Sequence, residues 1–164
     1  MWVFLDIDGV LVPEKNFDSL NANEDMFLKF DPICLKLFED ILEAHPDVLV
    51  GISSSWRDLF TLEAVKSFFS QNIAARIIGF TPLLDSENDD VYLDYRYKEI
   101  QEFLKLQNAS ADDWVAINDR REYYPSETKV VVTNSYYGFD KDAALALEEY
   151  LSAVNQENPA LCAI

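Results

Sequence analysis

Two aspartates separated by one residue follow an apolar run at the start of the chain. The segment reads Val3-Phe4-Leu5-Asp6-Ile7-Asp8-Gly9. Valine, phenylalanine and leucine favour a buried strand, and glycine lets the backbone turn sharply after the second aspartate. Hard divalent cations prefer carboxylate and carbonyl oxygens, so this strand end could hold one. Taken alone, the same residues are also typical of an ordinary surface turn.

Polar residues also follow two later apolar runs. One run ends in Ser53-Ser54-Ser55-Trp56-Arg57, and the other, beginning at Trp114, ends in Asn118-Asp119. If these runs are parallel strands, their carboxyl ends meet at one edge of a sheet, which is where such sheets bind ligands. Phosphoryl transfer through a carboxylate needs a nucleophile, a general acid, a cation site and donors for the phosphate oxygens. These segments can supply each of those groups.

Together the segments resemble the haloacid-dehalogenase (HAD) superfamily. Asp6-Ile7-Asp8-Gly9 fits its first motif, Ile52-Ser53 its second and Ile117-Asn118-Asp119 its fourth. Over most of the chain, roughly residues 2–151, the sequence is also similar to the HAD domains of bacterial "Swiss army knife" RNA-repair proteins. The strings that carry this narrower resemblance are Ile52–Arg57, Gly79-Phe80-Thr81-Pro82, Arg96–Ile100 and Tyr137-Gly138-Phe139.

The resemblance implies a Mg²⁺-dependent phosphatase that works through an aspartyl-phosphate. Asp6 would be the nucleophile and a metal ligand, and Asp8 would be the general acid/base with its backbone carbonyl on the metal. Asp119 would be the remaining protein ligand to Mg²⁺. The substrate would be a phosphomonoester, and the narrower family favours one on a nucleic-acid end.

The sequence does not decide which residues make two of the substrate contacts. Ser53 directly follows its apolar run and is favoured for binding the phosphate, with Ser54 and Ser55 as alternatives. The third HAD motif needs a Lys or Arg near the start of a helix, where Arg96 is preferred and Lys98 is the alternative.

Three further side chains with chemical potential have plain structural interpretations. Trp56 is predicted to lie in the core rather than to stack on a base. Arg57 could reach the substrate or pair with one of the many acids. His45 is the single histidine and precedes Pro46 at a helix end, so a structural or solvated role is expected.

The fourth motif departs from the common pattern of two acids, because Asn118 occupies the first position. Asparagine can offer an oxygen to a metal or to its water, but it brings no charge. Arg120 and Arg121 follow at once and could compete with a cation or bind a substrate phosphate. The alternative function is therefore a catalytically weak HAD-fold binding or regulatory module.

The hydrophobic pattern alternates between strand and helix. Apolar runs predict strands at 3–5, 48–52, 76–79, 114–117 and 129–132. Helical spacing predicts helices at 32–45, 59–69, 95–107 and 140–154, the first begun by Asp31 and Pro32. This order predicts an α/β fold with a central parallel sheet of about five strands. The resemblance implies a HAD-type, Rossmann-like three-layer sandwich with minimal or no cap.

The polar segments 13–30 and 85–94 are predicted to be loops. The first either leans over the site or is a solvated excursion held by a few apolar residues. A single domain is expected over residues 1–154, with a flexible tail at 155–164.

The chain has 164 residues and a formal net charge of -17. This charge argues against extended nucleic-acid binding and against anionic membranes, because both surfaces would repel it. No apolar run is long enough to cross a bilayer, and Cys34 and Cys162 lack metal-site spacing. We therefore expect a cytoplasmic protein that acts on a phosphorylated substrate, with an oligomeric state that the sequence leaves open.

Overall fold

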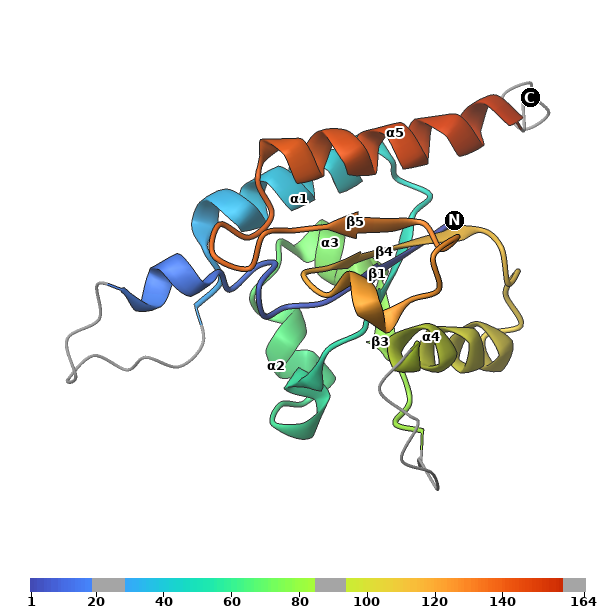
Figure 1. The fold of residues 1–164 in the computed structure, drawn as a ribbon, viewed down its shortest axis with the longest axis horizontal. Helices are drawn as coiled ribbons and strands as arrows, with labels where there is room; N and C mark the ends of the chain where they lie inside the picture. Colours follow the sequence, from blue (N-terminus) through green and yellow to red (C-terminus); the bar gives the residue numbers. More distant parts are fainter. Residues whose placement is uncertain (19–28, 85–93, 158–164) are drawn as a thin grey trace.

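The computed structural model describes residues 1–18, 29–84 and 94–157. Within them, five strands form one parallel sheet in the order β3-β2-β1-β4-β5 (Figure 1). The strands are β1 (Trp2–Leu5), β2 (Leu49–Ile52), β3 (Ile77–Phe80), β4 (Trp114–Asn118) and β5 (Val130–Val132). The first strand lies between β2 and β4, so the strand order reverses at β1. In such sheets a ligand crevice forms at the carboxyl ends of the strands at this point.

Helices cover both faces of the sheet (Figure 1). They are α1 (Pro32–Ala44), α2 (Leu62–Lys66), α3 (Gln71–Arg76), α4 (Tyr95–Leu106) and α5 (Lys141–Glu157), with short 3₁₀ turns η1 (Glu14–Phe17), η2 (Ser55–Asp58) and η3 (Arg121–Tyr123). The predicted three-layer, Rossmann-like sandwich is confirmed. The described residues contain no separate cap domain.

Side chains alternate across the strands and build two different cores. Val3 and Leu5 of β1 face the large core that α1, α3 and α5 complete. Trp2 and Phe4 face the opposite way, into a smaller aromatic core beneath α4. Gly51 of β2 is needed there, because a Cβ at that position would lie 2.6 Å from the Phe4 ring. The two faces together fix β1 rigidly, and its carboxyl end is where the first aspartate begins.

The helix predicted at 59–69 was wrong in its extent. The segment divides into η2 and the short helix α2, and α3 follows as a separate element that was not predicted. Thr61 causes the break, because its side chain caps α2 by accepting a hydrogen bond from the Ala64 N–H at 3.2 Å. The apolar spacing continued across this cap, so periodicity alone could not show it.

The ends of the chain and the two loops are described only in part. Helix α5 continues to Glu157, beyond the predicted end at residue 154. Of the loops predicted at 13–30 and 85–94, residues 19–28 and 85–93 lie outside the described residues, as do Cys162 and positions 158–164.

Cys34 and His45 both have structural surroundings, which for His45 is one of the two roles that the sequence predicted. Cys34 is buried in the large core. The His45 ring lies 2.9 Å from a carboxylate oxygen of Glu148 and joins the end of α1 to α5. None of the helices in the described ranges is both long and apolar enough to cross a membrane.

Candidate active site

The site is built where β1, β2 and β4 end side by side. Leu5 is in register with Ile52 on one side and with Ile117 on the other. Pairing continues one step further, since the Asp6 N–H donates to the Ile117 carbonyl at 3.0 Å and the Ser53 N–H donates to the Leu5 carbonyl at 2.8 Å. Asp6, Ser53 and Asn118 are therefore next to one another at a single sheet edge, as the sequence predicted.

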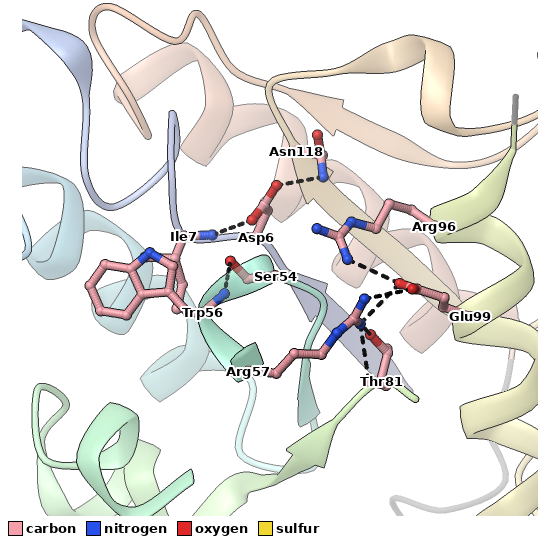
Figure 2. A network of polar contacts seen from close by, with 9 residues as sticks. All are labelled: Asp6, Ile7, Ser54, Trp56, Arg57, Thr81, Arg96, Glu99 and Asn118. Atoms are coloured by element: carbon pink, nitrogen blue, oxygen red, sulfur yellow. Dashed lines mark hydrogen bonds and ion pairs between the residues drawn. The ribbon is translucent and has the colours of Figure 1, made fainter. Parts of the chain in front are cut away.

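Asp6 is a buried carboxylate that the surrounding chain holds in place. It is only 8% exposed. One oxygen accepts from the Ile7 N–H at 2.7 Å, and the other accepts from the side-chain amide of Asn118 at 2.9 Å (Figure 2). Burial raises the pKa of Asp6 to about 6, against the opposing effect of Arg96. Each oxygen keeps a lone pair free, so the group remains able to attack an electrophile.

Asn118 cannot turn its oxygen toward a metal without losing a second contact. Its side-chain oxygen accepts from the Arg120 N–H at 2.8 Å, while its amide donates to Asp6. The two partners fix the orientation of the amide, because only one end of it can donate. Asn118 therefore acts here as a donor that orients Asp6, a role that the sequence analysis did not foresee.

The backbone turns sharply after β1. The N–H groups of Val10, Leu11 and Val12 all donate to the Ile7 carbonyl, at 2.8 to 3.1 Å. Gly9 has a φ of 70°, a conformation that residues with a side chain rarely adopt. Asp8 lies exposed on this turn and accepts a hydrogen bond from the Trp56 indole N–H at 3.1 Å.

Asp119 packs directly against the same turn. A Cβ at Gly9 would lie 2.6 Å from a carboxylate oxygen of Asp119, so the glycine makes room for this side chain. Burial raises the pKa of Asp119, while Arg120, whose Nε lies 3.8 Å from the carboxylate, lowers it. The second arginine is occupied elsewhere, because the Arg121 guanidinium donates to the carbonyls of Tyr124, Pro125 and Ser126.

The carboxylates of Asp6 and Asp119 are chemically suitable ligands for a magnesium ion. No group of three or more His, Cys, Asp or Glu side chains among the described residues is arranged as a metal site. Magnesium in phosphoryl-transfer sites, however, is bound through one or two carboxylates together with water and substrate phosphate. Asp6 and Asp119 supply two carboxylates, since Asp119 is close enough to raise the pKa of Asp6. The glycine that admits Asp119 to the turn is the observation that supports this fit.

A buried ion-pair cluster lies beside Asp6. The Glu99 carboxylate accepts two hydrogen bonds from Arg57, of 2.6 and 3.0 Å, and one from Arg96, of 3.0 Å. Arg57 also donates to the side chain of Thr81 at 2.9 Å. Figure 2 shows the Arg96 guanidinium between Glu99 and Asp6. Helix α4 carries both Arg96 and Glu99 three residues apart on one face, which places this cluster under the end of β1.

A comparison with protein families identifies the family of this chain. The family described as the HAD domain in Swiss Army Knife RNA repair proteins matches residues 2–144. The chain belongs to this HAD family. Membership indicates a HAD-type hydrolase. Comparisons with curated proteins and with solved structures found no match.

The two cations considered for the third motif lie in different places in this HAD domain. Arg96 is buried, only 5% exposed, and lies next to Asp6. Lys98 is exposed on another face of α4, where it lines a shallow surface pocket with Gln101 and Lys105. Residues two positions apart on a helix point in different directions. The geometry therefore brings Arg96 to the site and leaves Lys98 outside it.

The three serines of this HAD domain also occupy different places. Ser53 is fully buried, and in the part of the chain that the structure describes its hydroxyl has no hydrogen-bond partner. Ser54 is buried too, lies near enough to Asp6 to lower the pKa of that carboxyl, and accepts from the Trp56 N–H at 3.4 Å. Ser55 is exposed at the start of η2. Ser53 and Ser54 thus remain the candidates for contact with a phosphate.

Tyr124 is a candidate that sequence reasoning missed. Its hydroxyl is buried and has no partner among the described residues, and the same is true of the Ser53 hydroxyl and the Arg96 Nε. Burial raises the pKa of Tyr124, and so does the neighbouring charge of Asp6. Buried polar atoms are normally paired, so unpaired donors gathered around one carboxylate indicate a place for an anion. No spacing rule picks out this tyrosine, because it lies six residues after Asn118 in an irregular turn.

Proposed function

We propose that this HAD domain hydrolyses phosphomonoesters with Asp6 as the nucleophile. The observation that carries the proposal is the state of Asp6, a buried carboxylate whose two oxygens are each held by one donor. Among the described residues, the Ser53 and Tyr124 hydroxyls and the Arg96 Nε have no hydrogen-bond partner, and Arg96 and Tyr124 lie close enough to Asp6 for their charges to interact. A fixed carboxylate beside preorganised donors suits attack on a phosphorus atom whose oxygens those donors would hold.

The proposed reaction has two steps, the formation of an aspartyl-phosphate and its hydrolysis. A carboxylate oxygen of Asp6 attacks phosphorus, the bond from phosphorus to the ester oxygen breaks, and protonated Asp8 gives its proton to the leaving oxygen. Water then attacks the aspartyl-phosphate, its proton passes to the Asp8 carboxylate, and Asp6 is released with inorganic phosphate. Asp8 suits this role because it lies at the exposed mouth of the turn and not in the buried pocket.

Asp6, Asp119 and the backbone carbonyl of Asp8 would hold Mg²⁺. The ion would offset the repulsion between a carboxylate nucleophile and a phosphate dianion. Ser53 or Ser54, together with Arg96, would hold the phosphate oxygens.

The substrate class that we propose is a terminal phosphate on a large molecule. The described residues include no cap domain over the site, and the family description names RNA repair. A net charge of -17 opposes long contact with a nucleic-acid strand, so recognition would be limited to its end.

A second candidate is a binding module with little catalysis. Asn118 favours it, because the residue orients Asp6 without adding the negative charge that a second acid would bring to a metal. Weak metal binding would leave a pocket that takes up phosphate but turns it over slowly.

One screen separates the two candidates. Phosphate release is measured across sugar phosphates, nucleotides, phosphopeptides and oligonucleotides phosphorylated at either end, with Mg²⁺ or with EDTA. We expect Mg²⁺-dependent release that Asp6→Asn abolishes, while Asp40→Asn on the exposed face of α1 has no effect. Activity that survives Asp6→Asn would remove Asp6 as the nucleophile. Stabilisation by beryllofluoride and Mg²⁺ without any turnover would favour the binding module.

A further inference from the structure

The indole of Trp56 makes a polar contact outside the phosphate pocket. Its Nε1–H donates to one carboxylate oxygen of Asp8 at 3.1 Å, across 48 residues of sequence. The ring itself is only 4% exposed. A buried tryptophan thus directs its one polar atom at the residue proposed as general acid and base.

The ring is held firmly from its apolar side. It packs against Phe30 with ring centres 5.6 Å apart, against Phe60 at 4.9 Å and against Phe68 at 6.1 Å. An indole packed on several sides has little freedom to rotate, so its N–H has a fixed direction. Asp8 itself is exposed on its turn, and Trp56 gives its side chain a fixed partner.

We propose that Trp56 is the positioning residue of Asp8 in the proposed phosphatase reaction. This inference rests on the proposed function. An indole N–H can only donate, so the contacted oxygen of Asp8 must accept in both protonation states. A carbonyl oxygen accepts more strongly than the hydroxyl oxygen of a protonated carboxyl, so this contact favours the proton on the other oxygen of Asp8. Trp56 thereby favours one oxygen as the one that delivers the proton to the leaving group.

The position of Trp56 in the chain supports this role. It is the second residue of η2, the turn that follows Ser53 and Ser54 at the end of β2. The next residue, Arg57, anchors the same turn to Glu99 at 2.6 Å. One short segment thus lies beside both the nucleophile, through Ser54, and the acid/base, through Trp56.

The test uses the substitution Trp56→Phe, which keeps an aromatic ring and removes the N–H. Rates are compared on 4-nitrophenyl phosphate, whose leaving group needs little protonation, and on glycerol 2-phosphate, whose leaving group needs an acid. We expect kcat/KM to fall about tenfold on glycerol 2-phosphate and less than about twofold on 4-nitrophenyl phosphate. Equal losses on both substrates would mean that Trp56 is merely structural and would overturn the proposal.

Two further variants sharpen the comparison. Trp114→Phe is the matched control, since that indole donates to the Ala111 carbonyl at 2.8 Å, away from Asp8, and should show no dependence on the leaving group. In an Asp8→Asn background, Trp56→Phe should add no further loss on glycerol 2-phosphate. An additive loss would show that Trp56 acts independently of Asp8 and would contradict the proposal.

A readout without activity tests the contact itself. The chain has three tryptophans, so its indole N–H signals can be assigned by NMR from the Trp56→Phe and Trp114→Phe variants. In Asp8→Ala, the Trp56 signal should move upfield and exchange faster with water, while the Trp114 signal stays in place. An unmoved Trp56 signal would overturn the inference. A shifted signal in a protein that hydrolyses none of the screened substrates would leave the contact standing and reject the proposed function.

Discussion

The side-chain amide of Asn118 donates a hydrogen bond of 2.9 Å to Asp6, from a position 112 residues later in the chain. The Arg120 N–H holds the other end of that amide. A second acid at this position would place two carboxylates against each other in a buried pocket. Asparagine avoids that repulsion and still orients Asp6.

Asn118→Asp should make the stability of the protein depend strongly on the cation. At neutral pH without Mg²⁺, we expect the free energy of unfolding to fall by about 2 kcal/mol, because a buried like-charge pair forms. Excess Mg²⁺ should raise the free energy of unfolding of Asn118→Asp by more than it raises that of the wild type. Urea unfolding with and without Mg²⁺ measures both effects. Asn72→Asp, on the exposed start of α3, is the control and should change stability by less than about 0.5 kcal/mol.

Asp6 should give the protein a pH-dependent stability in the absence of metal. Burial raises the pKa of Asp6 from 3.8 to about 6, so the folded state holds this proton more tightly than the unfolded state. The stabilising contribution is therefore complete below 3.8 and is lost as the pH rises through about 6. Relative to Asp6→Asn, the wild type should lose about 3 kcal/mol across this interval. Urea unfolding of both proteins over a pH series measures the difference, and a constant difference would contradict the assignment.

Glu99→Gln should destabilise the fold and also reduce activity. The change leaves the guanidiniums of Arg57 and Arg96 buried without their shared anion, at a cost of about 3 kcal/mol. Arg96 also loses the partner that orients it beside Asp6. Chemical unfolding measures the first effect and kcat/KM the second. Glu102→Gln removes an exposed pair with Lys105 on the same helix and should do neither.

Tyr124→Phe should separate function from stability. Its hydroxyl has no partner within the described residues, so removing it deletes a buried unpaired group and costs no hydrogen bond. We expect the free energy of unfolding to stay equal or rise by about 1 kcal/mol, while kcat/KM falls about tenfold. Tyr150→Phe on α5, across the sheet, should alter neither quantity. A clear loss of stability would mean that this hydroxyl has a structural partner.

The sequence predicted the residues that stand directly at strand ends. Asp6, Ser53 and Asp119 follow apolar runs, and the register of parallel strands then brings them together whatever the loops do. The fold class followed from the same runs, because strands and helices alternate in short, clearly patterned segments. Local signals and topology are enough for this part.

Contacts between distant side chains could not be predicted. Arg57 and Glu99 are 42 residues apart on different elements, and their pairing depends on where α4 crosses the sheet. The orientation of Asn118 depends on a backbone N–H that only the folded turn presents. Whether Arg96 or Lys98 faces the site depends on how α4 is rotated about its axis. The sequence favoured Arg96 but could not determine this rotation.

The four buried ionic groups of the site, Asp6, Glu99, Arg57 and Arg96, consist of two carboxylates and two guanidiniums, so their formal charges cancel. The net charge of -17 is then carried by the rest of the chain, and it repels a polyanionic substrate at long range. Dissolved ions screen that approach but hardly affect the buried groups. For a phosphorylated oligonucleotide, kcat/KM should therefore rise with ionic strength, the reverse of the usual behaviour of proteins that bind nucleic acids. A small, singly phosphorylated substrate should respond much less.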